Sequence, residues 1–198
     1  MRKVSLDDLR TLAEEAKPLL TEAAARIGRP IKLYLHWTYD HYDTVHPEYH
    51  INVFQDGQIY IGTDNLSEYK LHTNRRNGGS VSIAATCAYN AKSTDDLGPE
   101  PPTDSQIEAI ALIVATLSTA LDITIDLSHV LTHAEAADNL DGEDRWHLPY
   151  GPRAANRNCS HWDFWVLKAG DEEGSGGNTL RGKGLWYQHN AIQPETAE

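Results

Sequence analysis

The most constraining feature of the sequence is residues 104–121, where apolar side chains recur at helical spacing. Thr103 or Asp104 can cap this helix, because a short polar side chain accepts a hydrogen bond from a free backbone N–H of the first turn. The predicted buried stripe consists of Ile107, Ile110, Ala111, Val114, Leu117 and Leu121. A helix with such a stripe packs against another apolar layer, so the chain is expected to have a layered core.

Several β-rich runs supply that second layer. The predicted strands are residues 31–37, 49–54, 59–62, 80–89 and a short strand-like run at 129–133. In the first run, Ile31, Leu33 and Leu35 alternate with Lys32, Tyr34 and His36. The second and third runs form a hairpin, because Asp56-Gly57 supplies the positive φ angles of a tight turn. We therefore predict an α/β fold with a central mixed sheet flanked by helices.

The N-terminal part of the chain predicts a helix over residues 5–27. Ser5 is a good N-cap with Asp8 three residues later, and Gly28 with Pro30 ends the helix. Pro18 should kink or split it, because proline lacks the N–H that a helix interior requires.

We expect a single domain over residues 1–198, with a core at 30–168 and a C-terminal tail at 169–198. Within the tail, residues 170–178 (GDEEGSGGN) predict a flexible loop, and residues 180–189 (LRGKGLWYQH) predict a short closing helix.

Composition excludes several classes of function. The net charge of -12, from 17 basic and 29 acidic residues, disfavours binding to nucleic acid. No apolar run reaches the roughly 20 residues of a membrane span, so we expect no membrane insertion. The N-terminus lacks a signal-peptide pattern, which predicts a cytoplasmic protein or one that leaves by another route. Cys87 and Cys159 are expected to be free thiols, with Cys87 in the core.

The ten histidines raise the question of which of them converge. His36 lies at a strand end, and His133 lies where a strand-like run passes into a helical one. Asp163 is enclosed by aromatic residues, so its carboxylate needs a partner if it is buried. Two imidazoles and one carboxylate are a common catalytic zinc set. Spacing alone leaves this triad as one selection among several, since most histidines are surface or satisfied core residues.

Six motifs in order resemble a known series, together with a tail segment, GGNTLRGKGLWYQHN. They are LYLHWT, YHINVFQDGQIY, NRRNGGSVSIAA, PPTDSQIEAIALIVATL, HVLTHAEAA and HWDFWVL. Over about residues 30–168 the chain resembles the N-acetylmuramoyl-L-alanine amidase and peptidoglycan-recognition-protein family, in its phage and prophage branch. The resemblance implies a mixed sheet with flanking helices and a zinc-floored groove.

The resemblance also implies a site, residue by residue. His36, His133 and Asp163 match the zinc ligands, and Tyr49 and His161 match catalytic positions beside the metal. Glu135 or Asp138 is a candidate to orient a ligand imidazole. The predicted substrate-binding residues are Trp37, Thr38, His72, Arg76 and Asn77, although a solvated loop or a core position explains several of them equally well.

Three features depart from the family pattern. Asp163 lies 30 positions after His133, so residues 138–158 are expected to form an inserted loop beside the groove. His147, Cys159 and His161 remain rival third ligands. The strand SVSIAA carries no glutamate, and His161 stands where lysine or arginine is usual.

The implied function is zinc-dependent hydrolysis of the amide between N-acetylmuramic acid and L-alanine in peptidoglycan, by a monomeric phage or prophage endolysin. Such an enzyme stays in the cytoplasm until it is released to the cell wall. The alternatives are a non-catalytic peptidoglycan-binding module and an interbacterial amidase toxin.

Overall fold

The computed structural model describes residues 2–143, 148–154 and 161–190. Its elements, in chain order, are β1 (Arg2–Val4), α1 (Leu6–Arg26), β2 (Lys32–Trp37), β3 (Ile51–Val53), β4 (Ile59–Ile61), β5 (Ser80–Ala85), α2 (Asp104–Leu121), β6 (Val130–Thr132), α3 (His133–Ala137) and α4 (Ser175–Asn190).

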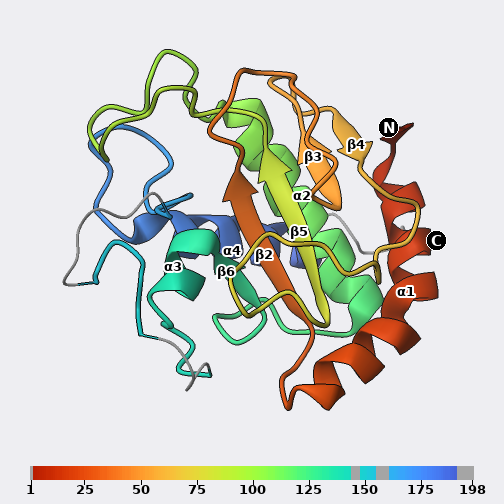
Figure 1. Cartoon of the computed structure of the whole chain (residues 1–198). Coiled ribbons are helices and arrows are strands. Elements are labelled where there is room, and N and C mark those ends of the chain that lie inside the picture. The colour runs from red at the N-terminus through yellow and green to blue at the C-terminus, as the bar shows by residue number, and fades with distance from the viewer. Residues whose placement is uncertain (1, 144–147, 155–160, 191–198) are drawn as a thin grey trace.

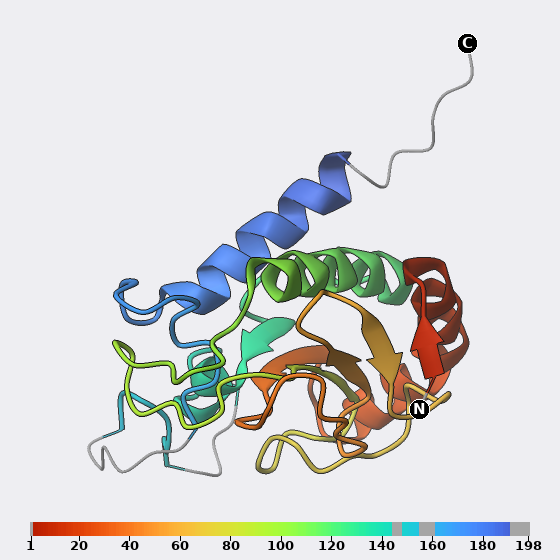
Figure 2. The ribbon, with the colours of Figure 1, turned by 90° about the horizontal axis from the view of Figure 1, so that it is seen from above.

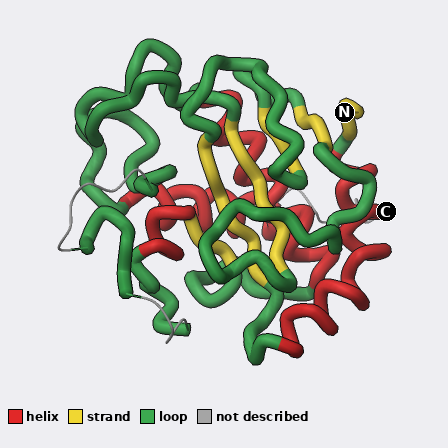
Figure 3. Tube along the Cα trace, viewed as in Figure 1, coloured by secondary structure: helices red, strands yellow, loops and turns green. Residues whose placement is uncertain are grey.

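The strands form one six-stranded sheet in the order β1-β4-β3-β5-β2-β6 (Figures 1 and 3). β2 runs parallel to both β5 and β6, whereas β4 is antiparallel to β3 and β1. β3 and β4 form the predicted hairpin around Gly57, whose φ is +84°. The predicted α/β class with a mixed sheet is confirmed.

Three helices cover one face of the sheet: α2 packs against α1 on one side and α4 on the other (Figure 2). Leu33, Leu35 and Trp37 of β2 point into this core, together with the apolar stripe of α2. By length and composition α2 is apolar enough to cross a membrane, but 67% of it is buried inside the protein. Core helices have this composition too, because they are apolar on nearly all sides.

Helix caps follow the predicted chemistry. Ser5 and Asp8 form a reciprocal capping box at α1, and Thr103 forms another with Gln106 at α2. The helix does not split at Pro18, because α1 continues through it as one element. Burial of Leu9, Leu20 and their neighbours against the core offsets the local cost of proline.

Two other expectations also need correction. β2 is buried on both faces rather than on alternate positions, because loops and α3 cover the face opposite α2. The segment 170–178 is not a loop throughout, since α4 begins at Ser175 and includes Gly176 and Gly177. Tertiary contacts of those glycines, described below, outweigh their low helix propensity.

The covered second face holds a buried ion network. Asp141 accepts hydrogen bonds from Lys32 Nζ at 2.9 Å and from Arg76 Nη1 at 2.8 Å, and all three side chains are at most 2% exposed. Glu143 pairs with the same lysine at 2.7 Å. This network ties the beginning of the predicted inserted loop to β2 and to the segment before β5.

Replacing Asp141 with alanine should therefore destabilise the protein strongly. Two buried cations would lose their shared carboxylate, and breaking a buried pair in this way costs about 3–5 kcal/mol. Urea unfolding measures the change. The matched control is Asp64→Ala, which removes a pair with Arg2 whose carboxylate side chain is 78% exposed, and its midpoint should stay near wild type. Equal midpoints for both variants would contradict the role given to the network.

Candidate metal centre

His36 and His133 are brought together by the register of two parallel strands. Leu35 of β2 pairs with Thr132, the last residue of β6, so the residues that follow them, His36 in β2 and His133 at the start of α3, lie side by side. Thr132 also caps α3 through a capping box with Glu135, which fixes the turn at His133. The two imidazole centroids are 4.7 Å apart.

Asp163 comes from a turn held by aromatic packing. The ring of Trp37 lies 4.8 Å from Trp162 and 5.6 Å from Phe164, the two residues that flank Asp163. Because Trp37 directly follows His36, the side chain that anchors the turn and the side chain that meets the carboxylate come from adjacent positions of β2. The aromatic frame predicted around Asp163 therefore buries the carboxylate beside the two histidines.

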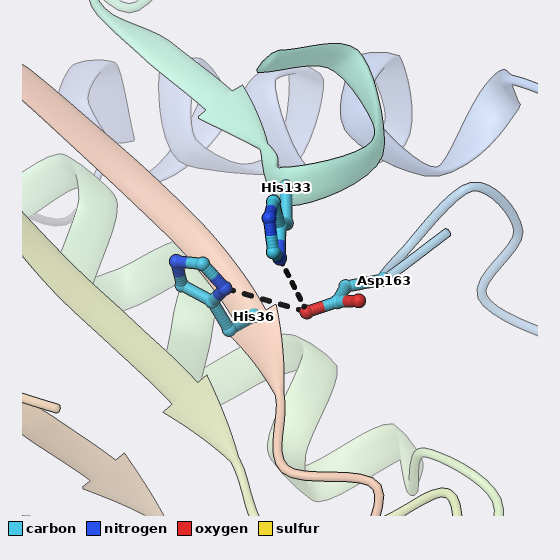
Figure 4. Close-up of side chains that lie close together, drawn as sticks. All are labelled: His36, His133 and Asp163. Carbon is cyan, nitrogen blue, oxygen red and sulfur yellow. Dashed lines mark hydrogen bonds and ion pairs between the residues drawn. The ribbon is translucent and has the colours of Figure 1, made fainter. Parts of the chain in front are cut away.

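The three side chains converge on one point (Figure 4). Asp163 Oδ2 lies 3.3 Å from His36 Nδ1 and 3.2 Å from His133 Nδ1. All three residues are buried, and their ligand atoms lie within 4.8 Å of one another. Burial raises the pKa of Asp163, but the neighbouring imidazoles of His133 and His36 outweigh it and hold the pKa well below its usual range. Burial lowers the pKa of His36 to about 4.

The donor set fits a zinc ion. Two imidazole nitrogens and one carboxylate oxygen are a common catalytic ligand set, with a fourth position left for water or substrate. Ligands at ~2.0 Å from a tetrahedral zinc lie about 3.3 Å from one another. The two nitrogen–oxygen separations of 3.3 and 3.2 Å match that spacing.

The rival third ligands differ in their positions. His147 and Cys159 lie outside the described residues. His161 lies beside the group, with its ring 4.9 Å from that of His133. Cys87 is a core residue, as predicted, and burial raises the pKa of its thiol well above the usual value, so it stays protonated.

Both predicted catalytic residues adjoin the three candidate ligands. The ring of Tyr49 lies 5.1 Å from that of His36. Burial, with the charges of Asp163 and Glu48, raises the pKa of the Tyr49 hydroxyl, which keeps it a hydrogen-bond donor. Burial, followed by the proximity of His133, lowers the pKa of His161. Tyr150, from the predicted inserted loop, packs 5.3 Å from His161 and was not anticipated.

The five predicted substrate-binding residues separate into two groups. Thr38 and His72 are half-buried, and the ring of His72 lies 5.2 Å from that of His36. Trp37 and Arg76 are at most 2% exposed, so neither presents a surface to a sugar or a peptide, and their predicted role is wrong. Asn77 is also buried, and its Oδ1 accepts hydrogen bonds from the backbone N–H groups of His72 and Thr73. These three residues support the site from within the protein.

Helix α4 supports the site from behind. Arg181 donates two hydrogen bonds of 2.7 Å to the carboxylate of Glu135, two residues after His133, and a third to the carbonyl of Val130. Glu135 and Asp138, the candidates to orient a ligand imidazole, bind other groups instead. The carboxylate of Glu135 accepts from Arg181, and that of Asp138 accepts a hydrogen bond from the backbone N–H of Arg153. The T-x-x-E spacing from Thr132 could have revealed the capping role of Glu135.

Two glycines let α4 approach both halves of the site. A Cβ on Gly176 would lie 2.0 Å from the carbonyl oxygen of Phe164, which follows Asp163. A Cβ on Gly177 would lie 2.3 Å from the carboxylate of Glu135. Only glycine allows this approach, which explains why a glycine pair occurs inside a helix.

The fold and the buried His-His-Asp group define an α/β protein with a candidate metal centre. The sequence profile of the N-acetylmuramoyl-L-alanine amidase family matches residues 22–147, more than half of the chain. The chain belongs to this family. His36 and His133 lie inside the matched range, whereas Asp163 and α4 follow it. No curated protein sequence gives a significant match.

Two solved structures are similar in part. One is the endolysin N-acetylmuramoyl-L-alanine amidase LysCS from Clostridium intestinale, with 18% identity, a TM-score of 0.38, and coverage of 54% of this chain and 70% of that one. The other is the Ph2119 endolysin of a Thermus scotoductus bacteriophage, with 21% identity, a TM-score of 0.38, and coverage of 54% and 73%. Membership of the family rests on the sequence match and not on these superpositions.

Replacing Gly176 with alanine should disturb the metal centre on its Asp163 side. The new methyl group would displace the Phe164 carbonyl and, with it, the adjacent Asp163, so metal uptake should fall together with the melting temperature. Gly182→Ala is the matched control on the same helix, because a Cβ there meets nothing within 4 Å. It should raise helix stability by about 0.5–1 kcal/mol. Metal titration and thermal unfolding measure both effects, and wild-type uptake in Gly176→Ala would contradict this role of α4.

Proposed function

We propose that this protein is a zinc-dependent amidase that cleaves the bond between N-acetylmuramic acid and L-alanine in peptidoglycan. Membership of the N-acetylmuramoyl-L-alanine amidase family supports the substrate and the bond. The observation that carries the zinc requirement is the buried convergence of His36, His133 and Asp163, with ligand spacings that suit the ion.

The protein's own residues divide the work around this centre. His36, His133 and Asp163 would hold the zinc, which when bound polarises the scissile carbonyl and activates water. Tyr49, kept protonated by its surroundings, donates a hydrogen bond to the oxygen that gains negative charge during attack. His161 is exposed and its ring lies 4.9 Å from that of His133, where it can accept a proton from the attacking water and pass it to the departing amine.

We further propose that the enzyme acts as a phage or prophage endolysin. The order of motifs and the names of the two partly similar structures support this role. Thr38 and His72 are the remaining candidates for contact with substrate, since both are half-buried. A toxin delivered to competing bacteria would use the same chemistry and differ in its partners.

The direct test is Asp163→Asn, which keeps the shape of the side chain and removes its charge. Wild type should hold one zinc per chain and release new L-alanine amino termini from purified peptidoglycan, and the variant should lose both. Elemental analysis and labelling of amino termini measure these. Asp171→Asn, in the following loop, should match wild type.

Other outcomes would change the proposal. Zinc and cleavage that survive in Asp163→Asn would move the third ligand to His147, Cys159 or His161. Wild type that binds peptidoglycan without zinc and without cleavage would be a binding module.

Tyr49→Phe tests the catalytic donor separately from the metal. Loss of one donor to a developing oxyanion lowers kcat by about 10²- to 10³-fold. Zinc content should stay at the wild-type level, since the ring that packs on His36 is retained. Steady-state kinetics on a soluble muropeptide would give kcat and KM. An unchanged kcat would exclude Tyr49 from the chemical step.

A further inference from the structure

A chain of hydrogen bonds leads from the backbone to the far side of the His36 ring. Ser80 Oγ lies 2.9 Å from the carbonyl oxygen of Asn77 and 3.3 Å from His72 Nε2. His72 Nδ1 lies 3.0 Å from Thr73 Oγ1, which in turn lies 3.3 Å from His36 Nε2. Ser80 and Thr73 are 2% or less exposed, so both hydroxyl groups are shielded from water.

The chemistry of the groups fixes the direction of each bond. A carbonyl only accepts, so Ser80 donates to Asn77 and its oxygen accepts from His72 Nε2–H. A neutral His72 then has a lone pair on Nδ1 and accepts from the Thr73 hydroxyl. The threonine oxygen is left to accept from His36 Nε2–H.

His72 is neutral in this arrangement for two physical reasons. Its ring is half-buried, and it lies 5.2 Å from the ring of His36 and 6.0 Å from that of His50. Its two ring nitrogens contact the hydroxyl oxygens of Thr73 and Ser80, which carry no negative charge to stabilise a protonated ring.

We infer that Thr73, His72 and Ser80 form a polarised relay that holds the proton of His36 on Nε2 and so presents the Nδ1 lone pair to the metal. The inference rests on the proposed zinc function. With the relay in place, two acceptors, His36 Nδ1 and Asp163 Oδ2, face each other at 3.3 Å. Two facing lone pairs repel unless a cation lies between them, so the relay prepares the site for a metal ion. These three are positioning residues, because none of them is a metal ligand.

The test is the tautomer of His36 in the metal-free protein, read from two-bond ¹H–¹⁵N spectra of histidine-labelled samples. Wild type should show the proton on Nε2. Thr73→Val removes the hydroxyl at nearly constant shape, so the proton should move to Nδ1 and bond Asp163. Zinc affinity, measured by competition with a chromophoric chelator, should then fall by about 10- to 100-fold. Thr73→Ser should restore both the tautomer and the affinity.

Thr86→Val is the matched control. Its hydroxyl is also buried and hydrogen-bonded, to the carbonyl of Val53, but it lies outside the relay. It should keep wild-type affinity. Ser80→Ala gives a second test further from the metal, and it replaces Thr73→Val if that variant does not fold. In Ser80→Ala the His36 proton should shift toward Nδ1.

Two results would overturn the relay: a wild-type His36 protonated on Nδ1, or an unchanged tautomer and affinity in Thr73→Val. If wild type takes up no zinc, the proposed function fails, and the tautomer in the metal-free protein still decides the relay.

Discussion

The structure depends on one costly interaction, the burial of the Asp163 carboxylate between two imidazoles. A buried carboxylate without a partner is destabilising by several kcal/mol, so the surrounding elements must hold its partners in place. β2 supplies His36, and β6 with the first turn of α3 supplies His133. Trp37 anchors the aromatic residues on either side of Asp163. The same residue cannot also stack on a sugar, which is why its predicted role failed.

The part of the chain after the family match completes the centre. Residues 22–147 include both histidines, but Asp163 and α4 follow that range. Arg181 and the Gly176-Gly177 pair connect α4 to the His133 side and to the Asp163 side at once. Helix α4, whose first residues were expected to form a loop, therefore holds both sides of the site in place. The ion network at Asp141 fixes the beginning of the predicted inserted loop to β2 and to Arg76.

Local rules explain what the sequence could predict. Capping residues and apolar periodicity located α1 and α2, and the Asp-Gly turn located the hairpin. The three candidate ligands came from their place at the ends of elements and from the resemblance to the amidase family. Positions decided by tertiary packing were missed. The continuous helix through Pro18, the early start of α4 and the burial of Arg76 all depend on partners distant in sequence. The Thr73 relay was invisible for the same reason, since its members lie on a loop and a strand that meet only in the fold.

The central claim is that His36, His133 and Asp163 form a zinc site without sulfur. X-ray absorption spectroscopy of the zinc-loaded protein tests it most directly, because the first coordination shell reports ligand type and distance. We predict only nitrogen and oxygen ligands at about 2.0–2.2 Å, with the outer-shell signal of two imidazoles. A sulfur ligand at about 2.3 Å would bring a cysteine into the site and contradict the assignment of Asp163.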